Sequence, residues 1–384
     1  MATPDAAVHQ SIAVPRVHAR SAVARTVIPW RTALNVSHDA SPPHPHRAAV
    51  PPVPAGAARP RWSVMIPTYH CAEYLAQTLC SVLRQAPEPD AMQIEVVDDC
   101  SERDDPERVV RDVGGGRVSF FRQPQNVGHV RNFNTCLQRS RGTLVHLLHG
   151  DDAVRDGFYS TLGDAFARES AIGAAFCRFI AMDGAGHWQT IGPLVAPVAG
   201  VLPNWLEQIA RGQRLQPPSI VVRRDVYERL GGFDDRIQSY GEDWEMWTRI
   251  AAHYPVWYEP EPLALYRLRA ASLSRGAVST GQNIRDLACA ISINRALLPP
   301  NEADAISRFA TVDTALTALR RSHRMLRAGE TRAPLVQLRE ALRLSRSPRV
   351  LAGSARLLAH WALVHVRRGL RGVRSAPPSA TSHS

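Results

Sequence analysis

Apolar runs of strand length alternate with amphipathic stretches of helix length in the first part of the chain. The runs WSVMIP, QIEVVDD, RVSFFRQ and GTLVHLL predict four strands, over residues 62–67, 93–99, 117–123 and 142–148. Helical patterning separates them, with capping residues in front of the stretch SERDDPERVVRDV. Because strand and helix alternate at the spacing of βαβ units, the pattern predicts an α/β domain with a mostly parallel, doubly wound sheet.

The same alternation continues beyond residue 152. A helix is expected over residues 156–168, a strand over 172–182, and a short strand, helix and turn within 217–237. A further helix is expected to start near Asp243, and VWYEPEPLALYRLR reads as extended chain that closes the domain. We therefore place the α/β domain at residues 61–300.

The two ends of the chain have different patterns. Residues 1–60 are rich in Pro, Ala, His and Arg without periodicity, which predicts a disordered leader. Residues 301–372 read as helices interrupted by Pro334 and Pro348, and residues 373–384 as a disordered tail. The prediction is thus one α/β domain with a helical extension behind it.

Charge is distributed unevenly along these parts. The chain carries a formal charge of +11, of which residues 1–60 contribute +4 and residues 301–384 contribute +10, so the domain itself is at −3. A nucleic-acid-binding domain would concentrate positive charge on the folded unit. The composition therefore argues against nucleic acid and for a basic tail near an anionic membrane surface.

The last predicted helix could make that contact. Arg349, Arg356, Arg367 and Arg374 are spaced to share one face, and Gly369 and Gly372 are expected to end the helix. Leu351, Leu358 and Trp361 are expected roughly opposite the arginines. A basic amphipathic helix is typical of a membrane-surface element, although an arginine-rich helix packed on the domain would have the same pattern.

Targeting and redox features favour a cytoplasmic protein. No apolar run near the start has the length of a secretory signal, and residues 350–366 are too short and too polar for a membrane span. The six cysteines have no C-x-x-C spacing, which favours a reducing compartment. We expect a cytoplasmic enzyme, peripheral on the inner face of the membrane.

The stretch LVHLLHGDD carries the first chemical signal. It begins as an apolar strand and ends in Asp151 and Asp152. Open α/β sheets bind ligands at the carboxyl edge of their strands, and two carboxylates there suit Mg²⁺ held together with substrate phosphates. An isolated Asp-Asp pair would more simply cap the following helix. Acidic pairs at 98–99 and 242–243 make a shared cleft the stronger interpretation.

Six motifs in order resemble the family 2 glycosyltransferases. They are VMIPTYH, VVDDCSERDD, NVGHVRNFN, LLHGDD, RRDVYERLGGFDD and GEDWEMW, and the likeness covers residues 62–270. The resemblance implies the GT-A fold and an inverting, nucleotide-sugar-dependent reaction with a divalent cation, Mg²⁺ or Mn²⁺. A metal would neutralise the diphosphate that leaves, and a general base would activate the acceptor hydroxyl.

The resemblance also implies roles for individual residues. Asp152 and Asp151 match the motif that holds metal and sugar, and Asp243 matches the base, with Glu242 beside it. The residues that match or adjoin nucleotide contacts are Thr68, Asp98, Asp99, Asn126, Gly128 and Arg131. Among these, Asp99 matches the carboxylate that accepts a hydrogen bond from uracil, so a UDP-sugar is the expected donor.

Several of these residues also have structural interpretations. Asp243 could cap its helix, and Asp99 could form an Asx turn with Ser101. Trp244 and Trp247 are more typical of core than of sugar-stacking platforms. Arg131 could equally be a surface arginine.

The chain departs from the family pattern at three positions. His70 stands where Asn is usual, and His149 where the first Asp of the metal motif often stands. Arg269 occupies the position of a His that in relatives helps to hold the metal and diphosphate. Loss of that His puts the metal requirement in doubt.

We therefore expect a hexosyltransferase of cell-envelope or extracellular polysaccharide or glycolipid synthesis, acting on a glycan or lipid-linked acceptor. A sugar nucleotidyltransferase would share the sheet and the acidic site, but PTYHCAEYL lacks the Gly- and basic-rich signature expected after its first strand. A non-catalytic nucleotide- or glycan-binding relative is the other alternative.

Overall fold

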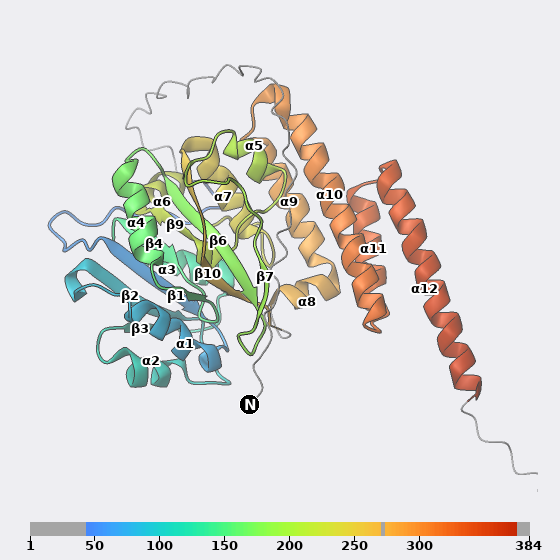
Figure 1. Cartoon of the computed structure of the whole chain (residues 1–384), viewed down its shortest axis with the longest axis horizontal. Coiled ribbons are helices and arrows are strands. Elements are labelled where there is room, and N and C mark those ends of the chain that lie inside the picture. Colours follow the sequence, from blue (N-terminus) through green and yellow to red (C-terminus); the bar gives the residue numbers. More distant parts are fainter. Residues whose placement is uncertain (1–43, 270–272, 375–384) are drawn as a thin grey trace, which may run out of the picture. The chain divides into compact units, whose positions relative to one another are not determined.

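The computed structural model describes residues 44–269 and 273–374 (Figure 1). The strands are β1 (Trp62–Thr68), β2 (Met92–Asp98), β3 (Ser119–Arg122), β4 (Leu144–Leu147), β5 (Ala153–Val154), β6 (Ala174–Met182), β7 (Trp188–Ile191), β8 (Gly200–Val201), β9 (Ile220–Arg223) and β10 (Val256–Arg267). The helices are α1 (Ala72–Leu83), α2 (Pro106–Gly114), α3 (His129–Arg139), α4 (Phe158–Arg168), α5 (Trp205–Ala210), α6 (Arg224–Leu230), α7 (Glu242–His253), α8 (Leu273–Thr280), α9 (Gln282–Arg295), α10 (Pro300–Arg327), α11 (Arg332–Leu344) and α12 (Pro348–Arg374).

One mixed sheet forms the centre of the α/β domain, with the strand order β3-β2-β1-β4-β9-β6-β10-β5. The segment from β3 to β4 is parallel, as predicted. Strand β9 then runs antiparallel to both β4 and β6, while β6 and β10 are parallel to each other. The short strands β5, β7 and β8 and the helix α5 were not predicted, because segments of two to six residues carry almost no periodicity.

Alternate residues of the central strands supply two cores, one on each face of the sheet. On β1, Val64 and Ile66 pack with α1 and α4, whereas Met65 packs with α3 and α7. This is the alternation that a pleated strand imposes. Trp244 and Trp247 are buried in the second of these cores, so their core interpretation is correct.

Residues 44–60 pack on the domain, which corrects their assignment to a disordered leader. Val50 is buried, the Gly232 N–H donates to the Ala48 carbonyl at 2.8 Å, and Arg224 Nη2 donates to the Pro51 carbonyl at 2.9 Å. These contacts satisfy backbone groups without any periodic pattern of side chains, so they could not be predicted from the sequence. Residues 1–43 and the tail residues 375–384 lie outside the described residues.

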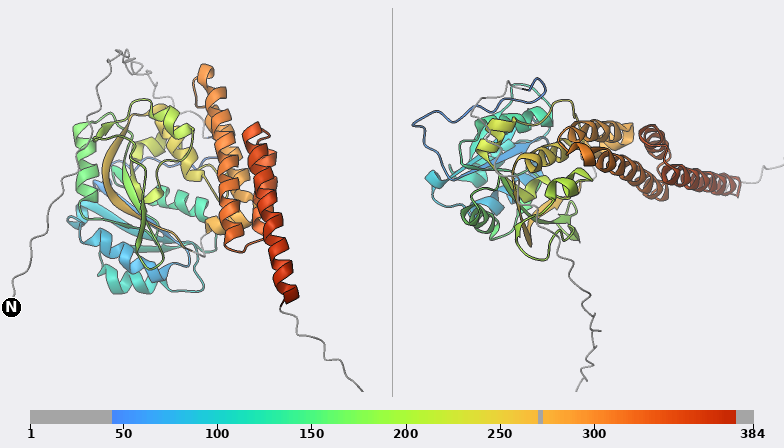
Figure 2. Two further views of the ribbon diagram at one scale, coloured as in Figure 1. Left: turned by 45° about the vertical axis from the view of Figure 1, so that its right-hand side comes forward. Right: turned by 90° about the horizontal axis from the view of Figure 1, so that it is seen from above.

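In the part of the chain that the structure describes, five helices follow the last strand, and they begin earlier than predicted, at Leu273 instead of 301. Helices α9 and α10 contribute Ala290, Ile291 and Ala310 to the core of the α/β domain. Both views of Figure 2 show α10, α11 and α12 side by side, and their buried residues form a core of their own. None of the helices in the described ranges is long and apolar enough to cross a bilayer.

Helix α12 differs from its prediction in two respects. It continues through Gly369 and Gly372 to Arg374. It packs on its neighbours through Val350, Ser354 and Leu357, while Leu351 and Leu358 remain about half exposed, at 49% and 47%. The helix therefore has a packed face and a separate exposed apolar stripe, in place of the single apolar face that we expected.

Candidate active site

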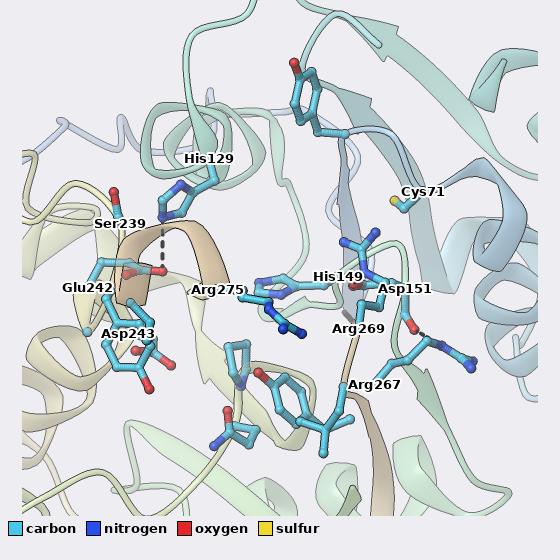
Figure 3. Close-up of a pocket in the computed structure, with 18 of the residues that line it drawn as sticks. Cys71, His129, His149, Asp151, Ser239, Glu242, Asp243, Arg267, Arg269 and Arg275 are labelled. Carbon is cyan, nitrogen blue, oxygen red and sulfur yellow. Dashed lines mark hydrogen bonds and ion pairs between the residues drawn. The ribbon is translucent and has the colours of Figure 1, made fainter. Parts of the chain in front are cut away.

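A cavity of about 860 Å³ opens at the carboxyl ends of the parallel strands (Figure 3). Its walls come from the end of β1, the turn after β4, the start of α3, the start of α7, the end of β10, and the helices α8 and α10. Segments far apart in the sequence therefore meet here. The volume is in the range of pockets that hold small-molecule ligands and cofactors.

The turn His149–Gly150–Asp151–Asp152 lies directly against the end of β1. The Gly150 N–H donates to the Pro67 carbonyl at 3.0 Å, and a Cβ on Gly150 would lie 2.5 Å from Thr68 Cγ2. Only glycine permits this close approach. On the other side, Asp152 Oδ1 accepts a 2.8 Å hydrogen bond from the Arg267 N–H of β10. Two strands thus fix the acidic turn.

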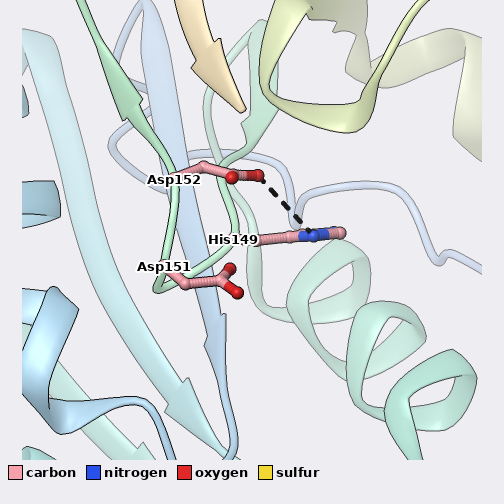
Figure 4. Close-up of side chains that lie close together, drawn as sticks. All are labelled: His149, Asp151 and Asp152. Carbon is pink, nitrogen blue, oxygen red and sulfur yellow. Dashed lines mark ion pairs between the residues drawn. The ribbon is translucent and has the colours of Figure 1, made fainter. Parts of the chain in front are cut away.

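His149, Asp151 and Asp152 form a cluster that could hold a metal ion (Figure 4). Their ligand atoms all lie within 4.8 Å of one another. Asp152 Oδ2 lies 3.9 Å from His149 Nδ1 and is buried without a hydrogen-bond partner, which is costly unless something else binds it. Burial and the neighbouring Asp151 raise the pKa of Asp152 well above its usual value. A cation would relieve both effects, so these residues fit a divalent metal. The sequence singled out the two aspartates but not His149 as a ligand.

Two arginines from the end of β10 surround this cluster. Arg269 Nε lies 2.5 Å from Asp151 Oδ2, so the arginine that replaces the family His contacts the acidic turn itself. Arg267 Nε donates to the Asp151 carbonyl at 2.8 Å, and its guanidinium also contacts Gln77 and lies over the Tyr74 ring. The negative charge of the cluster is therefore partly balanced by protein cations.

The nucleotide-side residues meet at the ends of β1 and β2. Both carboxylate oxygens of Asp99 accept backbone hydrogen bonds, from Val127 at 2.8 Å and from Gly128 at 3.0 Å. Asn126 donates to the Asp99 carbonyl, and Gly128 begins α3 with a φ of +85°. Burial raises the pKa of Asp99. Asp99, Asn126, Gly128 and Thr68 all line the cavity.

Asp98 and Arg131 do not line it. Asp98 is fully buried, accepts hydrogen bonds from Ser101 and Thr68, and pairs with Arg122 at 2.9 Å. It is therefore Asp98, and not Asp99, that bonds to Ser101. Arg131 is exposed on α3.

Glu242 and Asp243 lie across the cavity from Asp151, in the first turn of α7 (Figure 3). The helix is capped by Gly241 with φ +92°, so Asp243 is not its cap. Asp243 accepts hydrogen bonds from Gln213 Nε2 at 2.5 Å and from the Trp244 N–H at 2.7 Å. The positive end of the helix dipole favours carboxylates at this place.

A histidine that no sequence motif indicated completes this side. His129 Nε2 lies 3.4 Å from Glu242 Oε1 (Figure 3). Burial alone would lower the pKa of His129 and raise the pKa of Glu242. The attraction between the two groups outweighs burial, so the pKa of His129 is raised and the pKa of Glu242 is lowered. Only the fold brings the two together, because α3 and α7 are more than 100 positions apart.

The charge of Glu242 affects the pKa of the adjacent Asp243. Burial and the charge of Glu242 together raise the pKa of Asp243 to about 7. A carboxylate with a pKa near neutrality can accept a proton from a hydroxyl much better than one with an ordinary pKa. The two sides of the cavity therefore differ: one suits a cation and phosphates, the other a proton transfer.

An α/β domain with an acidic turn beside its first strand, facing carboxylates across a ligand-sized cavity, has the architecture of a GT-A glycosyltransferase. The model of "Glycosyl transferase family 2" matches residues 63–231, and that of "Glycosyltransferase like family 2" matches residues 205–295. The chain belongs to the family 2 glycosyltransferases, as the order of its motifs indicated. An uncharacterized protein of Mycobacterium tuberculosis, MT1568, is 27% identical over 254 residues, which are 61% of this chain and 75% of the relative.

Solved structures confirm the GT-A fold. Residues 1–349 of TarS from S. aureus match with a TM-score of 0.57 at 13% identity, over 80% of this chain and 92% of that one. The same TarS fragment has been solved with UDP-GlcNAc. The mannosyltransferase PcManGT from Pyrobaculum calidifontis, solved with GDP-Man and Mn²⁺, matches with a TM-score of 0.50 at 18% identity, over 84% of this chain and 90% of that one.

Proposed function

We propose that this protein is an inverting glycosyltransferase that moves a hexose from a nucleotide sugar to an acceptor hydroxyl. The observation that carries the proposal is the position of Asp243, across the cavity from Asp151 and with a pKa raised to about 7. Direct displacement at the anomeric carbon needs a base on the face opposite the leaving group. Two carboxylate sites on opposite walls meet that requirement.

The chemistry follows from this arrangement. Asp243 takes the proton of the acceptor hydroxyl, whose oxygen forms a bond to the anomeric carbon while the bond to the diphosphate breaks. The nucleoside diphosphate leaves with the bonding electrons, and the configuration is inverted. Gln213, which donates to Asp243, orients the base, and His129 keeps Glu242 charged beside it.

The donor is proposed to be a UDP-sugar. Support comes from Asp99, which matches the uracil-binding carboxylate of the family and lines the cavity near Thr68. Among proteins of this fold, TarS solved with UDP-GlcNAc is a precedent for a uridine nucleotide, whereas PcManGT was solved with GDP-Man. The bound hexose would lie between the acidic turn and α7.

A divalent cation is proposed to bind His149, Asp151 and Asp152 and, when bound, to neutralise the leaving diphosphate. An imidazole ligand favours Mn²⁺ over Mg²⁺, because Mg²⁺ prefers oxygen ligands alone. Arg269, in contact with Asp151, is placed to share the charge of the diphosphate.

We further propose that the enzyme acts at the cytoplasmic face of a membrane, in the synthesis of a cell-envelope polysaccharide or glycolipid. The support is α12, where exposed Leu351 and Leu358 form an apolar stripe and exposed Arg349 and Arg356 add positive charge. A helix of this kind binds an anionic bilayer in the interface plane.

The test of the reaction is a panel of nucleotide sugars incubated with the enzyme and Mn²⁺, with hydrolysis and transfer followed by NMR of the anomeric proton. We expect one uridine nucleotide sugar to be consumed with inversion. Retention of configuration, or the absence of turnover with every donor together with normal nucleotide binding, would contradict the proposal. The second result would identify a non-catalytic relative.

A further inference from the structure

The cavity is not closed by the α/β domain alone. On the side of α7 its wall is completed by α8 and α10, through residues that include Arg275, Arg321, Arg324 and Met325. If Asp243 is the base, as proposed above, this wall faces the acceptor. Its chemistry then selects what the acceptor can be.

Arg321 is held against the segment that leads into the proposed base. Its Nη2 donates to the Tyr240 hydroxyl at 3.2 Å, and its guanidinium lies 5.7 Å from the centroid of the Tyr240 ring. Tyr240 is three positions before Asp243 and lines the same cavity. The guanidinium is thus oriented by a hydrogen bond and a ring contact, which lowers the entropy lost when it binds a ligand.

Neither Arg321 nor Arg324 forms an ion pair with a carboxylate within the described part of the chain. Other arginines of this region do: Arg275 lies 3.4 Å from Glu330, and Arg320, the neighbour of Arg321, lies 3.5 Å from Asp313. Arg321 and Arg324 therefore bring two cations without carboxylate partners to this wall, whereas Glu242 and Asp151 of the same cavity are paired, with His129 and with Arg269.

We propose that the acceptor is anionic, and that Arg321 and Arg324 bind its phosphate or carboxylate while its hydroxyl reaches Asp243. An oxyanion matches the planar donor array of arginine and supplies the counter-charge that the protein lacks here. Without these cations, Glu242 and a deprotonated Asp243 would repel such an acceptor. The C-terminal helices thus serve as the acceptor-binding wall of the enzyme.

Anion binding can be measured without knowledge of the natural acceptor. The probes are glycerol 3-phosphate and glucuronate, with glycerol and glucose as neutral counterparts, titrated calorimetrically into the full-length protein with and without UDP and Mn²⁺. The variants are Arg321→Gln, Arg324→Gln and the double variant. Arg320→Gln is the matched control, because this neighbouring arginine pairs with Asp313 and does not line the cavity.

We expect at least one anionic probe to bind, with UDP present, and the double variant to bind it at least about tenfold more weakly. Arg320→Gln and the neutral probes should show no such effect, and UDP affinity should be unchanged in all variants. The comparison of the two probes distinguishes a phosphate from a carboxylate. The folding of each variant is checked by its melting temperature.

Two results would overturn the proposal: anion binding equal in the wild type and the double variant, or anions that bind only in competition with UDP. If anion binding depends on these arginines but the protein neither binds nor hydrolyses any nucleotide sugar, the anion site is supported and the glycosyltransferase reaction is refuted. If donor turnover is normal but anion binding does not depend on the arginines, the reaction is supported and the anion site is refuted.

Discussion

Asp243 shows how one residue acquires its chemistry from its neighbours. An aspartate in water is ionised near neutral pH and is a weak base. Here, burial and the adjacent charge of Glu242 raise its pKa to about 7, while His129 holds Glu242 in its charged form. The sequence indicated Asp243 and Glu242 through one motif, but it contained no sign that His129 would stand beside them.

The pH dependence of transfer should report this pair. Because Asp243 is protonated below its pKa, kcat is expected to rise with pH and to level off above about 7. Burial is the larger cause of the raised pKa, and Glu242→Gln removes the other, the charge of Glu242, so the acidic limb should move to lower pH. The test is to measure kcat over the range from about pH 5 to about pH 9.

Glu207→Gln serves as its control, since this carboxylate of α5 pairs with Arg211 away from the cavity. The assignment of this pKa to Asp243 would be refuted if the acidic limb of the kcat profile did not move in Glu242→Gln, or if it moved equally in the control.

At the scale of elements, two local contacts hold the carboxylates of the site in position. The acidic turn after β4 touches the end of β1 only because position 150 lacks a side chain, and α7 is fixed by Arg249. The guanidinium of Arg249 is buried, bonded to Glu245 and to the carbonyls of Leu230, Gly231 and Gly232. Both contacts position functional carboxylates without touching a substrate.

Gly150→Ala should displace the acidic turn from β1. The added Cβ would lie 2.5 Å from Thr68 Cγ2 and 3.0 Å from Cys71 Sγ. We expect a loss of about 1–3 kcal/mol in unfolding free energy and weaker Mn²⁺ binding. Thermal unfolding and Mn²⁺ titration measure the two effects. Gly212→Ala is the matched control, because no atom lies within 4 Å of its added Cβ; equal effects in both variants would contradict the argument.

Arg249→Leu should be among the most destabilising single changes in the domain. It leaves the Glu245 carboxylate buried and deprives it of its closest cation, a change that typically costs about 3–5 kcal/mol. Urea unfolding measures the loss. In Arg295→Leu, which breaks an exposed pair with Asp304, the cost should stay below about 1 kcal/mol. Similar losses in the two variants would contradict the role given to Arg249.

For the whole molecule, the alternating strands and helices of the α/β domain were predicted well from the sequence, whereas the segments that pack between or beside them were predicted poorly. The strands from β1 to β4 and the helices between them were readable because each has its own period, and the motifs identified both sides of the cavity. Strand β9 between β4 and β6, the packing of residues 44–60, and the early start of the helices at α8 depend on contacts between distant segments. The same is true of His129 and Arg321, whose neighbours in the site lie far away in the chain.

Membrane association is a property of the whole chain and can be tested directly. The protein should co-sediment with vesicles of phosphatidylglycerol and phosphatidylcholine, less so at high salt because the arginine attraction is screened. Leu351→Ser with Leu358→Ser should lower the partition coefficient at least about tenfold. Leu335→Ser, at an exposed leucine of α11, should not. Binding unaffected by the double change would exclude α12 as the contact.

The most direct test of the account compares Asp152→Asn with Asp243→Asn. For each variant, UDP-sugar binding is measured by calorimetry with and without Mn²⁺, and transfer is measured in parallel. We expect Asp152→Asn to abolish the Mn²⁺-dependent part of donor binding, and Asp243→Asn to leave binding intact and slow transfer by about 10²–10⁴-fold. If both variants lost binding alike, or both kept full transfer, the division of the cavity into a metal side and a base side would be wrong.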